Sequence, residues 1–313
     1  MILVTGGAGF IGSNLVHALN AAGADDIVVA DDLTDGDKCR NLSRARFLDL
    51  IDSDDLFARL NSLPKIDAVL HQGACSATTE RDGRFLLRNN IEYSKRLITW
   101  CLEREVPVLF ASSASVYGEG DHGFCETADS EEPLNAYAFS KWVVDCWIRR
   151  QLPKAKSQLV SLRYFNVYGP NEIHKAAQGM CSPILHFHRQ IAEDGAIKLF
   201  AGSDNFRRDF VHVDDCCAVN RWFIEHDVSG IFNCGTGTAR SFADVAQAME
   251  GCYDNATVTE VPFPDHLKGK YQAFTQADLT KLREAGCDHD FTTLEDGIAR
   301  YVEILKTDGG YRR

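Results

Sequence analysis

Short, nearly continuous apolar runs alternate with segments of helical spacing along the first half of the chain. The apolar runs cover residues 2–5, 27–30, 68–71, 106–111 and 158–164. The helical patterns lie between them, at residues 11–22, 54–60, 85–103 and 137–151. Strands without a polar face that alternate with helices are typical of a parallel sheet covered on both sides. The pattern therefore predicts an α/β fold with a doubly wound parallel sheet.

The alternation of apolar runs and helical segments is less regular in the second half of the chain. Residues 180–192 and 242–252 have helical spacing, whereas 197–200 and 210–213 resemble short strands. The apolar run 231–233 is expected to return to the first sheet. We therefore predict a larger domain, residues 1–168 with returning segments near 207–235. A smaller, mixed α/β domain, residues 169–206 and 236–313, is expected to bind substrate.

Charge and cysteine content narrow the possible partners. The formal net charge of −12 argues against nucleic acid or an anionic membrane as partner, because both require basic surfaces. No apolar run is long enough to span a bilayer, and the N-terminus does not have the pattern of an export signal. The chain has eleven scattered cysteines and no CxxC pair, which predicts reduced thiols, no metal site and a cytoplasmic location.

A glycine-rich turn follows the first apolar run and precedes a helical segment. Its glycines are Gly6, Gly7, Gly9 and Gly12. Glycines allow the tight turn and let the backbone approach a pyrophosphate, which the helix N-terminus then holds. The spacing predicts a dinucleotide bound to a Rossmann domain.

An acidic residue stands at the end of the second predicted strand. Asp31 lies 19 positions after Gly12, where a carboxylate can bind the adenosine ribose. Asp31 favours the free 2′-hydroxyl of NAD, since it would repel the 2′-phosphate of NADP. Lys38 and Arg40 follow closely and could offset that repulsion, so these residues leave the choice of cofactor open.

A serine, a tyrosine and a lysine form the candidate catalytic group. Ser113 ends a predicted strand, at the edge of the sheet where ligands bind. Tyr137 and Lys141 are four apart in a predicted helix and share a face. An ammonium near a phenol is expected to lower its pKa and make it a better base. Ser113 is expected to donate a hydrogen bond to the reacting oxygen.

Taken together, these features resemble the extended branch of the short-chain dehydrogenase/reductase superfamily. Asn89 and the segments 163–170, 208–215 and 233–237 are further marks of that branch. Most of its members act on nucleotide sugars, so Arg208 is expected to hold a substrate pyrophosphate in a two-pronged contact. The alternative role for Arg208 is an ion pair within the smaller domain.

Four further stretches resemble the heptose 6-epimerases of this branch: residues 73–80, 171–175, 200–203 and 267–279. The resemblance implies conversion of ADP-D-glycero-D-manno-heptose to its L-glycero epimer, which supplies heptose for the lipopolysaccharide core. It implies oxidation at carbon 6 by retained NADP and re-reduction on the opposite face. Inversion requires proton transfer on two sides, and the family's two proton-transfer residues match Tyr137 and Lys175.

The same resemblance implies a set of ligand contacts. The cofactor contacts are Gly6, Gly9, Phe10, Ile11, Gly12, Asp31, Asp32, Lys38, Gln72, Gly73, Ala74, Cys75, Ser76, Asn89, Lys141, Val167 and Lys175. The substrate contacts are Asn166, His186, Phe200, Ala201, Gly202, Ser203, Arg208 and Tyr271. His186 and His188 are not expected to bind a metal, because side chains two apart on a helix point apart. Asp32 and Ser53 depart from the family pattern, and both weaken the positive field that favours NADP over NAD.

Other functions remain as alternatives. A UDP-hexose 4-epimerase would use the same Tyr and Lys. A 4,6-dehydratase would need an acid–base pair after the serine strand, which Ser113-Ala114-Ser115 does not provide. A cofactor-binding regulator without catalysis would not need these side chains. The resemblance also implies a homo-oligomer, with a pentamer expected.

Overall fold

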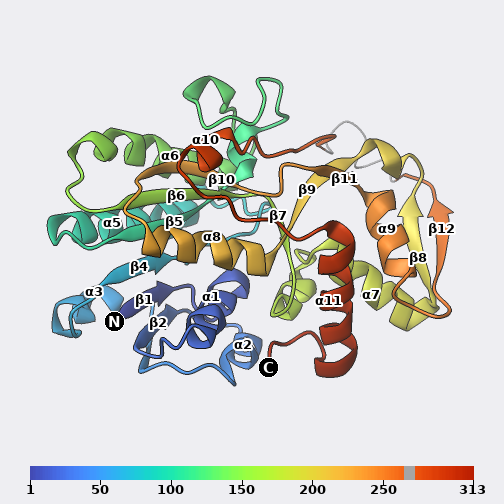
Figure 1. Ribbon diagram of the computed structural model, residues 1–313, viewed down its shortest axis with the longest axis horizontal. Coiled ribbons are helices and arrows are strands. Elements are labelled where there is room, and N and C mark those ends of the chain that lie inside the picture. Colours follow the sequence, from blue (N-terminus) through green and yellow to red (C-terminus); the bar gives the residue numbers. More distant parts are fainter. Residues whose placement is uncertain (264–271) are drawn as a thin grey trace.

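The structure, a computed structural model, describes residues 1–263 and 272–313. Its centre is a seven-stranded sheet in the order β10-β6-β5-β4-β1-β2-β3, in which every neighbouring pair is parallel (Figure 1). The strands are β1 (Ile2–Thr5), β2 (Ile27–Asp31), β3 (Asp49–Asp52), β4 (Ala68–His71), β5 (Val108–Ser113), β6 (Leu159–Tyr164) and β10 (Gly230–Cys234). The predicted doubly wound parallel sheet is confirmed, as is the return of the chain to this sheet at β10.

Two helical layers cover the sheet because successive strand residues face opposite sides. Val4 packs in one hydrophobic cluster with Leu15 of α1 (Phe10–Ala21) and Phe223 of α8 (Val213–Glu225). Leu3 packs in a second cluster with Ile98 of α5 (Tyr93–Glu103) and Ile148 of α6 (Ala136–Gln151). The remaining short helices are α2 (Cys39–Leu42), α3 (Leu56–Arg59), α4 (Gly83–Leu86) and α10 (Thr280–Glu284).

The second half of the chain builds a further layer beside the carboxyl ends of the strands. Its elements are β7 (Asn166–Tyr168), β8 (Ala196–Phe200), β9 (Arg207–His212), β11 (Ala239–Ser241), β12 (Thr257–Val261), α7 (Pro183–Asp194), α9 (Phe242–Glu250) and α11 (Leu294–Asp308). β11, β9 and β7 form one small sheet, and β12 and β8 form another. α7, α9 and α11 stand at the right of Figure 1 and bury a separate hydrophobic cluster.

Two long helices, α8 and α11, are not among the predicted elements. α11 carries local signals that predict a helix: Thr293 caps its start by accepting a hydrogen bond from Asp296 N at 3.2 Å, and Gly309 ends it with φ of 61°. Strand β3 is also not predicted, because Asp49 and Asp52 interrupt the apolar pattern that identifies the other strands.

Within the described residues, no helix combines the length and the apolar character needed to cross a bilayer. All eleven cysteines lie in the described part of the chain, and each is a free thiol.

Candidate active site

The glycine turn brings two backbone segments into contact. A Cβ on Gly6, where φ is 63°, would lie 2.5 Å from the backbone N of Gly73, in the turn after β4. A Cβ on Gly12 would lie 2.1 Å from the carbonyl oxygen of Gly6. Only glycine permits this approach. Gly9 begins α1 without a side-chain cap, so the first N–H groups of this helix remain available to an anion such as a pyrophosphate.

The Asp31 carboxylate closes the turn from the end of β2. Its Oδ2 accepts hydrogen bonds from Ala8 N at 2.7 Å and Gly9 N at 3.2 Å. Lys38 Nζ donates to Oδ1 of Asp31 at 2.8 Å and also contacts the Asp32 carbonyl. Lys38 therefore compensates the negative charge of Asp31. This is the role expected of Lys38, which would reduce the repulsion between Asp31 and the 2′-phosphate of NADP.

The Asp32 side chain points to its own turn. Its Oδ1 accepts a hydrogen bond from Thr34 N at 2.7 Å, and the Thr34 bonds lower the pKa of the Asp32 carboxyl. Both Thr34 bonds engage the same oxygen of Asp32, so the cofactor contact at Asp32 stays a prediction.

A pair of adjacent asparagines holds the turn after β4 that contains residues 72–76. Asn90 binds both backbone groups of Cys75: its Oδ1 accepts from Cys75 N at 2.9 Å and its Nδ2 donates to Cys75 O at 3.0 Å. Asn90 Nδ2 also donates to Ser140 Oγ of α6, and Asn89 Nδ2 donates to Asn90 Oδ1, both at 3.0 Å. The asparagines lie in a π-helical turn, a feature frequent at functional sites.

Asn90 is a site residue that sequence reasoning did not identify. The available signal is an asparagine doublet inside an otherwise helical segment, because asparagine has a low helix propensity and needs a tertiary partner there.

In the turn that follows β4, the Gln72 amide has both its oxygen and its nitrogen buried without a protein partner. With the glycine contacts, this orphaned amide fits a bound dinucleotide.

Ser113, Tyr137 and Lys141 meet where β5 and α6 converge. Asn135 caps α6 by accepting a hydrogen bond from Ala138 N at 2.8 Å, which places Tyr137 in the first turn. The Tyr137 phenol is hydrogen-bonded to the Ser113 hydroxyl. Lys141 lies one turn later and donates to the Ala111 carbonyl at 2.7 Å.

The electrostatics of this group differ from the expectation. Burial raises the pKa of the Tyr137 phenol, and the Ser113 hydrogen bond opposes this without outweighing it. Burial therefore dominates the phenol pKa in the protein chain alone, and the lowering of that pKa by Lys141 stays a prediction. Burial also lowers the pKa of Lys141 to about 8, with Asp145 opposing the change. Desolvation dominates because both side chains are almost completely enclosed.

Lys175 lies in a 3₁₀ turn that follows β7 and reaches toward α1. The turn covers Ile173–Gln178, and Lys175 Nζ lies 5.6 Å from the ring centre of Phe10, the first residue of α1. Burial lowers the pKa of the Lys175 ammonium. The structure thus brings Lys175 beside the helix that is predicted to hold the dinucleotide. Val167 of β7 is half-buried nearby in the chain and packs against the α1 side of the core.

The predicted substrate residues belong to several elements of the second half. Asn166 is exposed at the start of β7, and β7 pairs with β9, which carries Arg208. Thr275 Oγ1 donates to Asn166 Oδ1 at 3.4 Å and accepts from Asp209 N at 3.2 Å, so it links the two strands. Arg208 is 6% exposed and donates to the carbonyls of Arg207 and Gln272.

Other predicted contacts lie farther along the same layer. Phe200 ends β8 with its ring 38% exposed, followed by the turn that contains Ala201, Gly202 and the buried Ser203. His186 is exposed on α7 and interacts with Gln190, whereas His188 interacts with the Tyr253 hydroxyl. Tyr271 lies outside the described residues.

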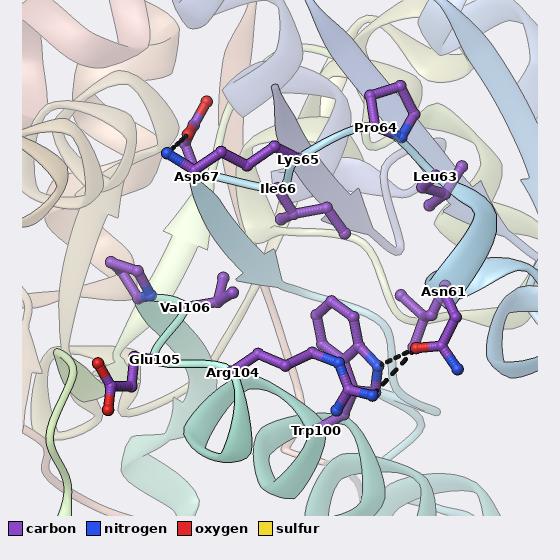
Figure 2. A pocket seen from close by; sticks show the side chains of 12 residues that line it. Asn61, Leu63, Pro64, Lys65, Ile66, Asp67, Trp100, Arg104, Glu105 and Val106 are labelled. Carbon is purple, nitrogen blue, oxygen red and sulfur yellow. Dashed lines mark hydrogen bonds and ion pairs between the residues drawn. The ribbon is translucent and has the colours of Figure 1, made fainter.

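One surface cavity lies away from all of these residues. It has a volume of about 450 Å³ and is lined by Pro64, Ile66, Trp100 and Val106 among others (Figure 2). Residues 66 and 106 precede β4 and β5, so the cavity is at the amino ends of the strands, opposite Ser113. Its polar contacts are internal: Trp100 Nε1 and Arg104 Nη2 both donate to Asn61 Oδ1 at 3.1 Å (Figure 2). It therefore contributes no candidate chemistry.

Comparisons with known proteins agree with this arrangement. Residues 2–235 match the NAD dependent epimerase/dehydratase family. The chain is 50% identical to an ADP-L-glycero-D-manno-heptose-6-epimerase of Alkalilimnicola ehrlichii, over 97% of each chain. It superimposes with a TM-score of 0.84 on the crystal structure of the Helicobacter pylori ADP-L-glycero-D-manno-heptose-6-epimerase, at 28% identity over 98% and 96% of the two chains.

A similar match is found with the UDP-glucose 4-epimerase of Thermotoga maritima, with a TM-score of 0.81 and 28% identity over 98% and 99% of the two chains. The resemblance noted in the sequence is thus confirmed along nearly the whole length. The chain belongs to the NAD dependent epimerase/dehydratase family.

Proposed function

We propose that the protein converts ADP-D-glycero-D-manno-heptose to ADP-L-glycero-D-manno-heptose by inversion at carbon 6. The observation that carries this assignment is the 50% identity to a heptose epimerase over 97% of both chains. The Ser113, Tyr137 and Lys141 group supports the reaction type. It does not distinguish between sugars, because a 4-epimerase requires the same groups.

The family to which the chain belongs uses a nicotinamide dinucleotide. We propose NADP rather than NAD, since Lys38 Nζ donates to Asp31 Oδ1 at 2.8 Å and compensates the negative charge of that carboxylate. Asp32 and Ser53 argue in the other direction, because neither adds positive charge for a 2′-phosphate. Identification of the dinucleotide released on denaturation tests this choice, and NAD as the sole nucleotide would refute it.

The chemistry can be assigned to the protein's own groups. When bound, a nicotinamide ring would supply hydride acceptance at carbon 6 and its return. Tyr137 Oη would take the proton of the substrate hydroxyl on one side of carbon 6 as the phenolate, and Ser113 would hold the reacting oxygen by a hydrogen bond. Lys141 would supply the positive charge that stabilises this phenolate against the burial that raises the phenol pKa. Lys175 Nζ moves the proton on the opposite side, because inversion leaves the new hydroxyl out of reach of a single base.

The remaining contacts follow the domain division. We propose that residues 1–168, with the returning segments near 207–235, bind the cofactor, and that residues 169–206 and 236–313 bind the sugar nucleotide. The separate cluster under α7, α9 and α11 supports this division, whereas Leu282 and Cys287 pack with the core of the first part. We assign Arg208 to the pyrophosphate and Asn166, His186 and residues 200–203 to the rest of the substrate.

Cellular roles follow from the proposed reaction. We propose that the enzyme is cytoplasmic, supplies heptose for the lipopolysaccharide core and works as a homo-oligomer, with a pentamer as the expected assembly. Light scattering of the purified protein tests the assembly, and a monomer would refute it.

An assay with two substrates tests the function. Purified protein is incubated with ADP-D-glycero-D-manno-heptose and, separately, with UDP-galactose, and the products are separated by chromatography. Epimerisation of the heptose is expected. Epimerisation of UDP-galactose alone would establish the runner-up, a UDP-hexose 4-epimerase. Tyr137→Phe should retain the dinucleotide and reduce turnover at least a hundredfold; unchanged turnover would place the catalytic group elsewhere.

A further inference from the structure

The turn that carries Lys175 is anchored on two sides by the residues that precede it. On the side of α1, Asn171 has a left-handed backbone with φ of 72°, and its Nδ2 donates to Ser13 Oγ at 3.0 Å. Asn171 also accepts from Arg312 N at 2.9 Å and donates its own N–H to the Gly310 carbonyl at 2.8 Å. This anchor fixes where the turn begins.

The second anchor is Glu172, a carboxylate with 1% exposure. Its Oε2 accepts from Ser182 N at 2.7 Å, and its Oε1 accepts from Ser182 Oγ at 2.6 Å and Gly169 N at 3.5 Å. Ser182 is the N-cap of α7. The backbone carbonyl of Glu172 accepts from Lys175 N at 2.9 Å. One residue therefore ties the start of α7 to the turn that carries the ammonium.

We propose that Glu172 is a positioning residue for Lys175: its carboxylate fixes the turn between β7 and α7 and provides the negative charge that faces the ammonium. The proposal rests on the proposed role of Lys175 in proton transfer. Both oxygens of Glu172 accept hydrogen bonds from Ser182, which offsets the cost of burying its charge.

Glu172 supplies the main negative charge among the groups that surround Lys175. Burial lowers the pKa of Lys175, and the charge of Glu172 opposes this change. Burial raises the pKa of Glu172, and the Ser182 hydrogen bonds and the charge of Lys175 oppose it. The Cys181 thiol faces Lys175 from the residue before Ser182, and burial raises its pKa, so it is neutral at pH 7. Burial lowers the pKa of the neighbouring His174, which is then also neutral.

Other charges act on the neighbours of Lys175: Arg189 of α7 acts on Cys181 and Tyr301, and Asp35, Lys38 and Asp31 act on His174. Among the described residues, Glu172 is the carboxylate that acts on Lys175 itself. α1 contributes the Phe10 ring, and α11 contributes the Tyr301 phenol beside Glu172. Burial raises the pKa of that phenol well above its ordinary value, so it remains protonated. When the negative charge of Glu172 is removed, no carboxylate among the described residues around Lys175 should therefore remain to stabilise its ammonium.

Glu172→Gln tests the proposal, with acetylation of Lys175 by acetic anhydride as a readout independent of turnover. Modification of the Lys175 peptide is measured by mass spectrometry from pH 6 to pH 11 in the full-length protein with its bound dinucleotide. Only the neutral amine reacts, so we expect the labelling profile of the variant to move to lower pH and the rate at pH 7.5 to rise severalfold. We expect kcat to fall at least tenfold with KM within about twofold.

Glu126→Gln is the matched control, because Glu126 also accepts a backbone hydrogen bond, from Asn233 N at 2.7 Å, but does not face Lys175. It should leave the Lys175 profile unchanged. An unchanged profile in Glu172→Gln would overturn the proposal. A rate increased equally at every pH would also overturn it, because that result indicates a loosened turn instead of a lost charge.

Ser182→Ala keeps the test decisive if Glu172→Gln does not fold. It removes one hydrogen bond to the Glu172 carboxylate but keeps its charge, so the Lys175 profile should stay at the wild-type pH while kcat falls. A shift of the profile to lower pH in this variant would overturn the proposal, because the negative charge is still present. Labelling does not require epimerisation, so a wild-type protein that fails to epimerise heptose refutes the proposed function and leaves the test of Glu172 intact.

Discussion

Lys141 is a candidate catalytic residue that the fold holds at a cost in stability. Lys141 is only 4% exposed, and burial lowers the pKa of its ammonium from an ordinary 10.5 to about 8. Since each pKa unit corresponds to about 1.4 kcal/mol, keeping the charged form in the fold costs about 3 kcal/mol at pH 7. Replacement by an uncharged side chain of similar length should recover this free energy.

Lys141→Met is the appropriate change, because methionine is unbranched and adapts to the same space. The variant loses the hydrogen bond that Nζ donates to the Ala111 carbonyl at 2.7 Å. Because the cost of the charge is already counted, this bond is valued as that of an uncharged donor, at about 1 kcal/mol. We therefore expect the free energy of unfolding to rise by about 2 kcal/mol at pH 7, while turnover is abolished. Natural enzymes commonly accept such a cost at an active site.

The gain depends on pH in a direction set by the lowered pKa. Lysine is charged in the unfolded chain up to about pH 10.5 and in the folded protein only up to about pH 8. The cost of the buried charge is therefore complete below pH 8, decreases as the pH rises from 8 to 10.5 and is absent above that window. The advantage of Lys141→Met should shrink over the same range and then reverse.

Urea unfolding followed by tryptophan fluorescence measures the difference at pH 7, 9 and 10.5, on protein freed of bound nucleotide. Lys156→Met is the matched control, because the Lys156 side chain is 80% exposed and should change stability little. A variant that is less stable than the wild type at pH 7, or a difference that is constant with pH, would refute the reasoning.

Three further predictions follow from contacts in and below the site. Gly12→Ala places a Cβ 2.1 Å from the Gly6 carbonyl oxygen and should eliminate bound dinucleotide, measured by absorbance after denaturation, whereas Gly36→Ala, with no atom within 4 Å, should retain it; equal nucleotide content in both would contradict the glycine contacts. Asp145→Ala removes a carboxylate that accepts from Arg163 Nε at 2.8 Å, Ser112 Oγ and Ser161 Oγ in the core, so it should lower the free energy of unfolding by about 3–5 kcal/mol in urea. A loss no larger than that of the exposed Asp121→Ala would argue against the buried ion pair. Lys38→Ala should weaken NADP binding about tenfold in calorimetry, equivalent to about 1.4 kcal/mol, and affect NAD much less; an equal loss for both would exclude a role in phosphate recognition.

The local sequence was sufficient for the sheet and for the cofactor turn. Strands buried on both faces are mostly apolar, so β1, β4 and β6 are visible as nearly continuous runs, with Ser161 and Arg163 as buried polar exceptions in β6. The glycine spacing at Gly6 and Gly12 reports backbone contacts that no other residue permits. The Tyr137 and Lys141 pair is visible because helical periodicity alone places both on one face.

The same local signals were incomplete where contacts are long-range. β3 has charged ends, and it is held by long-range contacts: pairing with β2, from Val28↔Asp49 to Asp31↔Asp52, and burial of Ile51 in the core. Asn90 is important because it joins Cys75 and Ser140, which are 15 and 50 residues away along the chain. Lys175 was recognised only by family resemblance, since a lysine in a loop has no periodic or spacing signal.

The amino-acid order by itself therefore determined the class of fold and the glycine turn, and it identified the candidate catalytic group. Tertiary structure alone decided which buried groups surround that chemistry: the enclosure that raises the pKa of Tyr137 and lowers the pKa of Lys141, and the Glu172 carboxylate that faces Lys175. The physical reason is that propensity and periodicity act between near neighbours in the chain, whereas desolvation and charge depend on everything that packs within a few ångströms.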